Sequence, residues 1–87
     1  MTEYSEVRFT RHARDKFELM RYYGFEVDEK KVVEAIRNPT LLEQRNSQYF
    51  ATRTINARYA LRVVYEKRKG YLTVITFYPV RRERHDI

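Results

Sequence analysis

The pattern of the sequence changes at Pro39. Before this residue, apolar side chains recur at the three- and four-residue spacings of amphipathic helices, whereas after it come runs of Tyr, Phe, Val, Ile and Thr that are typical of strands. Proline disfavours helical geometry at the residue before it, so a helix should end at Asn38. Helices followed by consecutive strands indicate an α+β domain in which the helices cover one face of a sheet.

The first part of the sequence predicts a short strand followed by a helix. Residues 7–9 are suited to the strand, and Thr10 is a suitable N-cap for a helix over about 11–23. Gly24 occupies the position after the helix end, where a left-handed conformation is favoured. The residues expected to form the buried stripe of this helix are Ala13, Phe17 and Met20.

A second helix is predicted to begin after Asp28. This residue is a suitable N-cap, and Val27 and Val32 stand at the two positions of a hydrophobic staple across the helix start. We expect the inner face of this helix to consist of Val32, Val33 and Ile36.

Four strands are predicted after Pro39, and the connections between them are short, so neighbouring strands should be antiparallel. The predicted strands cover residues 40–45, 49–54, 58–67 and 71–80. The fold class is therefore α+β, with the order β-α-α-β-β-β-β: a short N-terminal strand and two helices, then a four-stranded antiparallel meander. We expect one domain over residues 1–87.

Gly70 is predicted to set the register of the last hairpin. We expect a three-residue loop over 68–70 with Gly70 in the left-handed conformation, which places Lys67 opposite Tyr71. Counting back along the strands puts one row of side chains under the helices and another on the opposite face. The predicted pairs are Val63 with Ile75 and Leu61 with Phe77 in the core row, and Val64 with Val74, Arg62 with Thr76 and Ala60 with Tyr78 in the opposite row.

The preceding hairpin is predicted to have a two-residue turn at 55–56. This turn places Arg53 opposite Arg58 and Tyr49 opposite Arg62, on the same open face. Like charges directly opposite each other destabilise a sheet by up to about 1 kcal/mol, a cost that a bound phosphate relieves.

The composition excludes several classes of protein. A chain of 87 residues supports one core, and the absence of cysteine excludes disulfides, thiolate metal sites and a cysteine nucleophile. Residues 1–7 lead into no apolar run, so we expect no secretory signal and no membrane span, and therefore a cytoplasmic protein without membrane partners. Two glycines are too few for a Gly-rich phosphate loop, and no metal-ligand spacing is present, so we expect no metal site and no cofactor.

The positive charge is concentrated in the second half of the sequence. Residues 1–43 hold 8 Lys and Arg against 9 Asp and Glu, whereas residues 44–87 hold 10 against 3, so the halves carry −1 and +7 and together give the net charge of +6. Evenly scattered basic residues are usually only solvated. A basic half that coincides with the predicted sheet instead indicates a surface for a polyanion, and we expect RNA.

The basic and aromatic residues of this half are candidates for a site that binds single-stranded nucleic acid, since arginines hold phosphates and flat rings stack with bases. An alternative interpretation makes the two tyrosines half-buried strand residues and the C-terminal segment a frayed end. The candidates are Arg53, Arg58, Arg62, Tyr49, Tyr78 and Thr76, with Arg81, Arg82, Arg84 and His85 at the C-terminal end.

The two histidines, His12 and His85, are candidates for proton transfer because imidazole changes its charge near neutral pH. A lone histidine is more often structural. His12 also stands two residues after the predicted N-cap, where it can connect the helix start to the sheet.

Two segments resemble the RelE/ParE-like superfamily of bacterial and archaeal toxins. The ending Thr76-Phe77-Tyr78-Pro79-Val80-Arg81-Arg82, the arginines of the central strands and the predicted element order are similar to that superfamily. The segment Phe9-Thr10-Arg11-His12-Ala13-Arg14 resembles a branch of it, related to BrnT-like toxins, that begins with a His-Ala helix.

The resemblance implies an endoribonuclease, either ribosome-dependent or free, that is neutralised by an antitoxin protein covering its basic face. By position it implies that Arg53 and Arg62 are the basic residues of the sheet, and that Tyr78 or His85 is the C-terminal aromatic or histidine. The sequence departs from the superfamily by lacking a lysine pair on the middle strand and by carrying a histidine on the first helix. ParE-like members are not nucleases.

Three functions remain open. The first is metal-independent RNA cleavage by attack of a 2′-hydroxyl on the adjacent phosphate, which needs a base, positive charge and a proton for the leaving oxygen. We assign Arg62 and Arg53 to the charge, His12 to the base or acid, and Tyr78 to orientation or stacking. The second is a non-catalytic module that binds nucleic acid or protein through the same face, and the third is antitoxin-controlled inhibition of another enzyme. Each is compatible with a homodimer.

Overall fold

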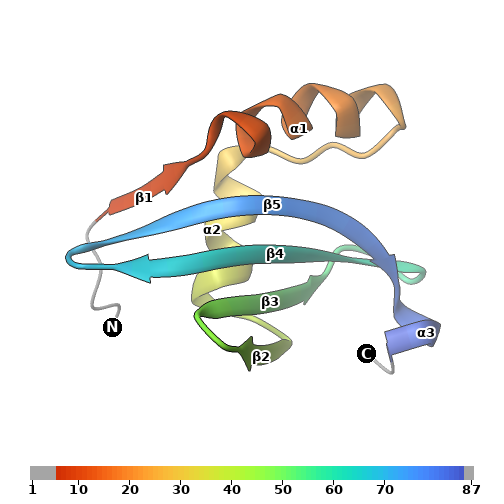
Figure 1. Cartoon of the computed structure of the whole chain (residues 1–87). Helices are drawn as coiled ribbons and strands as arrows, with labels where there is room; N and C mark the ends of the chain where they lie inside the picture. Colours follow the sequence, from red (N-terminus) through yellow and green to blue (C-terminus); the bar gives the residue numbers. More distant parts are fainter. Residues whose placement is uncertain (1–5, 86–87) are drawn as a thin grey trace.

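The computed structural model describes residues 6–85, and for His85 only the backbone. Five strands form one mixed sheet in the order β1-β5-β4-β3-β2, against which two helices pack (Figure 1). Strands β2 to β5 form the predicted antiparallel meander, while β1 adds a fifth strand parallel to β5. The predicted α+β class is confirmed, with one more strand in the sheet than predicted. The elements are β1 (Glu6–Phe9), α1 (Arg11–Tyr22), α2 (Glu29–Arg37), β2 (Leu41–Arg45), β3 (Gln48–Thr54), β4 (Tyr59–Arg68), β5 (Tyr71–Arg81) and α3 (Arg82–His85).

The predicted capping residues start both long helices. Thr10 and Asp28 each accept a hydrogen bond from the backbone N–H three residues later, at 3.1 and 2.9 Å. Gly24 follows α1 with φ +89°, the left-handed conformation expected there. Helix α2 ends at Arg37, two residues before Pro39. The local signals in the sequence therefore bound the helices to within a residue.

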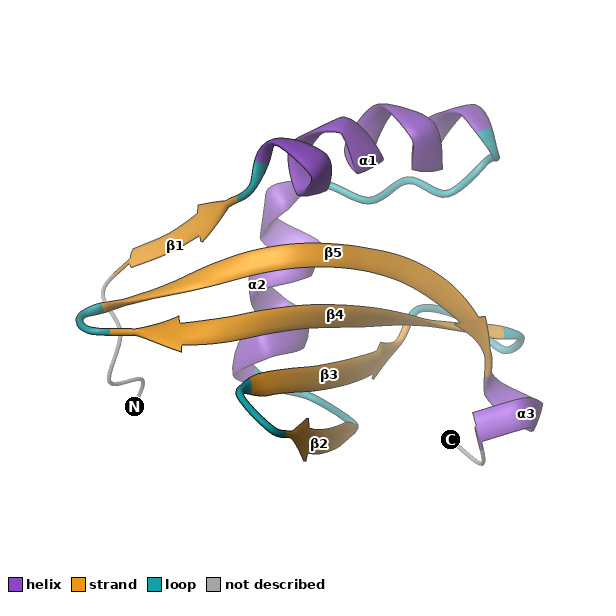
Figure 2. Cartoon of the chain, viewed as in Figure 1, coloured by secondary structure: helices purple, strands orange, loops and turns teal. Residues whose placement is uncertain are grey.

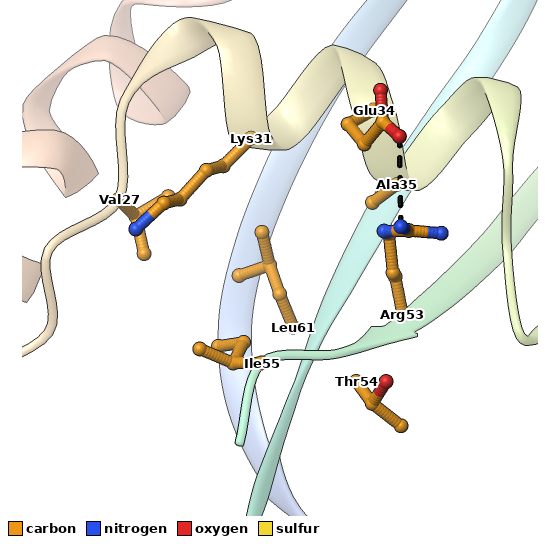
Figure 3. A pocket seen from close by; sticks show the side chains of 8 residues that line it. All are labelled: Val27, Lys31, Glu34, Ala35, Arg53, Thr54, Ile55 and Leu61. Carbon is orange, nitrogen blue, oxygen red and sulfur yellow. Dashed lines mark ion pairs between the residues drawn. The ribbon is translucent and has the colours of Figure 1, made fainter.

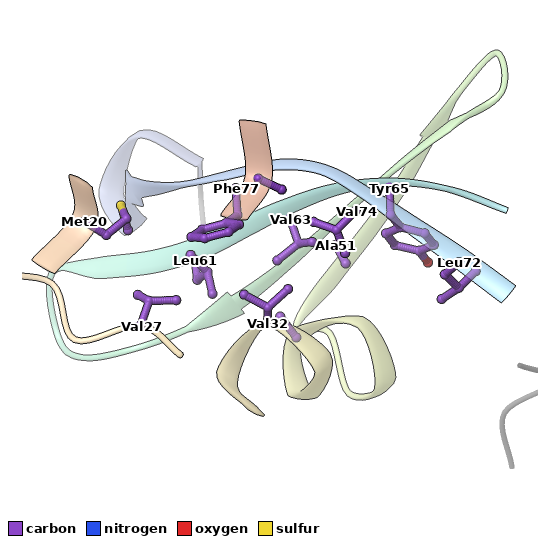
Figure 4. Packing of buried hydrophobic residues seen from close by; sticks show 12 residues of the cluster. Met20, Val27, Val32, Ala51, Leu61, Val63, Tyr65, Leu72, Val74 and Phe77 are labelled. Atoms are coloured by element: carbon purple, nitrogen blue, oxygen red, sulfur yellow. The ribbon is translucent and has the colours of Figure 1, made fainter. Parts of the chain in front are cut away.

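The core lies between the helices and one face of the sheet, hereafter the helix face (Figure 4). Phe77 is fully buried there and packs against Phe17 of α1, with 4.8 Å between the ring centroids. Full burial of such a side chain is worth about 1.5–3 kcal/mol. The buried residues that the sheet contributes are Ala51, Leu61, Val63, Tyr65, Leu72, Val74 and Phe77.

The turn of the β4–β5 hairpin differs from the prediction. It consists of two residues, Lys69 and Gly70, so Arg68 rather than Lys67 pairs with Tyr71. Gly70 takes the expected left-handed conformation, with φ +86°. The prediction of a three-residue loop is therefore wrong, and the register next to the turn is shifted by one residue from the predicted one.

A β-bulge at Ile75 shifts the register of this hairpin a second time. A one-residue slip moves a side chain to the other face of a sheet, and two slips together restore the predicted faces beyond the bulge. Arg62 therefore pairs with Tyr78 instead of Thr76, yet it shares a face with both. Val74 lies before the bulge and is buried in the core, contrary to prediction. The pairs beyond the bulge are Val64–Thr76, Val63–Phe77, Arg62–Tyr78, Leu61–Pro79 and Ala60–Val80.

The β3–β4 connection contains four residues, 55–58, where two were predicted. Asn56 explains the length, because its side-chain oxygen accepts hydrogen bonds from two following backbone N–H groups, each at 2.9 Å. The register differs from the predicted one by an odd number of residues, which places Arg53 and Tyr49 on the helix face. Their predicted positions on the open face are therefore wrong. Arg53 pairs with Leu61, Tyr49 with Tyr65, and Thr52 with Arg62.

The face of the sheet away from α1 and α2, hereafter the open face, carries a second row of side chains. Figure 2 shows α2 behind the sheet and α1 beyond β5, so neither covers this face of β3 and β4. Thr52 is nevertheless fully buried on it, beside the Arg62 side chain that contacts it. The row consists of Phe50, Thr52, Ala60, Arg62, Val64, Thr76, Tyr78 and Val80.

Candidate functional site

His12 is placed by contacts between the start of α1 and the bulge of β5. The Thr10 N–H donates to the Val74 carbonyl and the Thr10 hydroxyl to the Ile75 carbonyl, both at 3.1 Å. Two residues later, Nε2 of the exposed His12 lies 3.2 Å from the Thr76 hydroxyl oxygen. The bulge that restores the register thus also brings an imidazole to the edge of the open face.

Arg62 is held from two directions on the open face. Its Nε donates to the Thr52 hydroxyl at 3.1 Å, and its Nη2 lies 3.6 Å from the Glu43 carboxylate. Only 12% of the Arg62 side chain is exposed, so these contacts restrict the guanidinium to one orientation. A fixed guanidinium presents its donors as a rigid fork, the geometry that matches a phosphate.

Tyr78 and Thr76 lie between Arg62 and His12. Tyr78 is the cross-strand partner of Arg62, and Thr76 lies two residues earlier on the same face of β5, about 7 Å away along the strand. Both side chains are half-buried. The order across the open face is therefore Glu43 on β2, Thr52 on β3, Arg62 on β4, Tyr78 and Thr76 on β5, and His12 at the start of α1.

Glu43 is a candidate that our sequence reasoning missed. It belongs to the acidic half of the chain, yet its carboxylate reaches the guanidinium of Arg62, and 41% of its side chain is exposed. The sequence does contain a signal for this position, the alternation of side chains along the strands. With the correct β3–β4 register, alternation places Glu43, its partner Phe50 and the Thr52–Arg62 pair on one face.

Arg53 lies in a different environment, in a hollow between α2 and β3 on the helix face (Figure 3). Its Nη1 donates to the Asn38 carbonyl at 2.7 Å, and its Nη2 lies 3.5 Å from the Glu34 carboxylate. The predicted action of Arg53 beside Arg62 is therefore wrong in its geometry, because the two side chains leave opposite faces of the sheet.

Tyr49 also belongs to the helix face. Its ring stacks on that of Tyr65, with 5.3 Å between centroids, and the Lys67 ammonium lies 4.4 Å from its centroid. The ring is half-buried against the core. Of the two interpretations of Tyr49, the half-buried strand residue is the one that agrees with its position.

The remaining basic candidates gather where β4 begins and β5 ends. Arg58 lies in the β3–β4 loop, Arg81 is the last residue of β5, and Arg82 and Arg84 belong to α3. The His85 side chain lies outside the described part of the chain. These residues are set apart from Arg62 along the hairpin.

Comparisons with protein-family models, curated proteins and solved structures found no match to this chain. Within residues 6–85, no helix is both long and apolar enough to cross a membrane. In the same part of the chain, no cluster of three or more His, Asp or Glu residues is placed to hold a metal ion. The function of the open face is therefore inferred from its geometry.

Proposed function

We propose that the protein binds single-stranded RNA on the open face and cleaves it without a metal ion, by attack of a 2′-hydroxyl on the adjacent phosphate. The observation that supports this proposal is the alignment of a carboxylate, a fixed guanidinium and an imidazole across one face of the sheet. These are the base, the positive charge and the acid that the reaction requires.

Arg62 holds the phosphate in this proposal. Thr52 orients the guanidinium before the substrate binds, so the charge that develops on the phosphate meets a donor that does not have to reorganise. The guanidinium also contacts the Glu43 carboxylate, and the 3.6 Å between Nη2 and the carboxylate oxygen is longer than a hydrogen bond.

Glu43 and His12 provide the two proton transfers. The carboxylate accepts the proton of the attacking 2′-hydroxyl, and the imidazolium donates a proton to the leaving 5′ oxygen. Glu43, Phe50, Val64 and Thr76 lie in one row across β2 to β5, so three strand spacings, about 14 Å, separate the backbone of Glu43 from that of Thr76, at which the imidazole lies. In this proposal the phosphodiester lies between the two groups, with its phosphate at Arg62.

Tyr78 completes the site by offering a ring for base stacking next to the phosphate. In the toxin–antitoxin arrangement that the resemblance implies, an antitoxin protein covers this face and blocks access to Arg62. RNA and the antitoxin would therefore compete for the open face.

A non-catalytic nucleic-acid-binding module is the second candidate, and one observation favours it. With 12% of its side chain exposed, Arg62 presents only an edge to a ligand. An edge is enough for a phosphate contact, whereas stabilising a reaction at the phosphate demands closer engagement.

RNA cleavage separates the two candidates. Purified protein is incubated in EDTA with end-labelled single-stranded RNA, with and without ribosomes. We expect fragments that end in 2′,3′-cyclic phosphates in at least one of the two conditions, and no cleavage of the matching 2′-deoxy oligonucleotide. Intact RNA in both conditions, together with measurable binding, contradicts cleavage and leaves the binding module.

A further inference from the structure

A polar hollow lies at the end of the β4–β5 hairpin, apart from the residues assigned to cleavage. It has a volume of about 200 Å³, and its lining, hereafter the arginine hollow, is Ala57, Arg58, Tyr59, Arg81 and Glu83. Pockets for drug-sized ligands fall in the range of about 300–1,000 Å³. The arginine hollow is smaller than that, so it has room for a phosphate group and not for a whole nucleotide.

The rim of the arginine hollow is built by Arg82 and Asn56. The Arg82 backbone N–H donates to the Arg58 carbonyl at 2.9 Å, and its guanidinium donates to the Asn56 carbonyl at 3.0 Å. The Asn56 side chain in turn holds the N–H groups of Arg58 and Tyr59. These contacts fix the loop, so Arg58 is positioned beside Arg81 before any ligand binds.

The side chains that line this hollow carry a net positive charge. Arg58 and Arg81 face a single carboxylate in the lining, that of Glu83. The Arg81–Glu83 pair is long, at 3.8 Å, and both side chains are more than half exposed, so it contributes little. Within residues 6–85, no hydrogen bond or ion pair engages the exposed Arg58 guanidinium. Two guanidinium groups that share a hollow in this way are suited to an anion that accepts several hydrogen bonds.

We propose that the arginine hollow binds a nucleotide phosphate, held by Arg58 and Arg81. Tyr59 adds a half-buried ring, fixed edge-on against Phe25 with 5.2 Å between centroids. The Tyr59–Arg81 pair lies three ladder steps from the Arg62–Tyr78 pair, about 10 Å along the strands, and the odd number of steps places the two pairs on opposite faces of the sheet. An RNA strand whose scissile phosphate lies at Arg62 therefore has to pass around the end of the hairpin to place another of its phosphates in the hollow. That the bound phosphate belongs to an RNA strand rests on the proposed function, whereas the binding of a phosphate in the arginine hollow does not.

Binding of uncleavable probes tests the hollow. Fluorescence anisotropy is measured with labelled 2′-deoxy oligonucleotides of two and eight nucleotides, and line shifts in NMR spectra with adenosine monophosphate. The variants are Arg58→Gln and Arg81→Gln, and the matched control is Lys69→Gln, which removes the same charge at the opposite end of the same hairpin.

We expect each hollow variant to bind the octamer roughly fivefold or more weakly than the wild type, and the salt slope to fall by about 0.7 for each lost phosphate contact. The control should stay close to the wild type in both. An effect that appears with the octamer and is absent with the dinucleotide identifies a flanking phosphate of a bound strand. Saturable, Arg58-dependent binding of the mononucleotide identifies a separate phosphate-carrying ligand.

Equal behaviour of the hollow variants and the Lys69 control with every probe overturns the inference. The outcome is distinct from failure of the proposed function. Loss of octamer binding in Arg58→Gln in a protein that leaves RNA intact supports the hollow and contradicts cleavage. Cleavage of RNA by a protein in which Arg58→Gln and Lys69→Gln bind alike contradicts the hollow and leaves cleavage standing.

Discussion

Arg53 and Arg62 lie on neighbouring strands and engage a glutamate at nearly the same distance, yet they belong to opposite faces of the sheet. On the helix face, Arg53 donates to the carbonyl of Asn38, the C-cap residue of α2, and contacts Glu34 of the same helix. On the open face, Arg62 contacts the side chains of Thr52 and Glu43, which belong to two other strands. Arg53 therefore stabilises the end of a helix, whereas Arg62 is oriented among side chains that can take part in proton transfer and phosphate binding.

The difference follows from what each face leaves unsatisfied. The last carbonyls of a helix have no partner within the helix, and a guanidinium nearby satisfies one of them. Arg53 is therefore explained by the structure of α2. The hydrogen bond to Thr52 and the contact with Glu43 are both made by side chains, and the strands need neither for their backbone pairing. This contrast makes Arg62 the functional candidate and Arg53 its natural control.

Replacement of the two arginines by lysine should show the largest contrast. Lysine keeps the charge but loses the rigid fork, so Arg62→Lys should lower the RNA cleavage rate by about 10²–10³-fold, the usual cost of removing one transition-state donor. Arg53→Lys should leave the rate within about twofold, because its side chain lies on the other face. Initial rates on labelled RNA, with circular dichroism to confirm the fold, measure both.

An equal loss of activity in both lysine variants would contradict the division between the faces. It would mean that general charge or stability, and not the orientation of one guanidinium, controls the reaction. Unchanged rates in both would remove Arg62 from the site and leave the fold as described.

The two glutamates sharpen the same comparison. As the proposed base, Glu43 should be essential to kcat, and Glu43→Gln should lower it by about 10²-fold. Removing this anion should also leave RNA affinity unchanged or slightly higher, because one repulsion with the phosphates is lost. Glu34→Gln, which alters the partner of Arg53, should change neither quantity. A fall in affinity with unchanged kcat in Glu43→Gln would show that this residue only positions Arg62.

The elements of the fold were predictable because their signals are local. The helix ends are marked by residues that act within a few positions of a boundary: Thr10, Asp28, Gly24 and Pro39. The strands also begin and end within a residue or two of the predicted positions. The shared face of Arg62 and Tyr78 was predicted as well, although from a register with two compensating errors. Two one-residue register errors together leave a side chain on its predicted face, so the face of Arg62 and Tyr78 was predicted correctly even though the turn was not.

The rest of the site depends on facts that no local pattern contains. The β3–β4 register differs from the predicted one by an odd number of residues, and this difference alone moved Arg53 and Tyr49 to the helix face. Asn56 carries a signal for the longer loop, as a residue that favours Asx turns. No glycine lies at the bulge at Ile75, so the sequence gives no signal for it. The His12–Thr76 contact joins residues that are 64 positions apart in the sequence. Such a contact requires the whole sheet to be placed first.

The two tyrosines allow a smaller test of the two faces. Base stacking is worth about 1–3 kcal/mol per ring, so Tyr78→Leu should weaken binding of an uncleavable oligonucleotide by about tenfold. Tyr49→Leu removes a ring that stacks on Tyr65 under the helices and should leave this affinity unchanged while lowering thermal stability. Anisotropy titrations and thermal melts separate the two effects. Loss of affinity in Tyr49→Leu at a temperature well below its melting point would place RNA on the helix face.

The smallest expected effect concerns the stability that Arg53 contributes. A double-mutant cycle with Arg53→Gln and Glu34→Gln, followed by urea unfolding, should give a coupling free energy of about 0.2–1 kcal/mol, the range of solvent-exposed ion pairs. Both side chains are more than two-fifths exposed, which limits the electrostatic gain. Arg53→Gln alone should cost somewhat more than the coupling, because the hydrogen bond to the Asn38 carbonyl is also lost. RNA cleavage should be unaffected by the double variant. A double variant that keeps its stability but loses cleavage would show that the helix face takes part in the reaction, and the assignment of Arg53 to the structure of α2 would then be wrong.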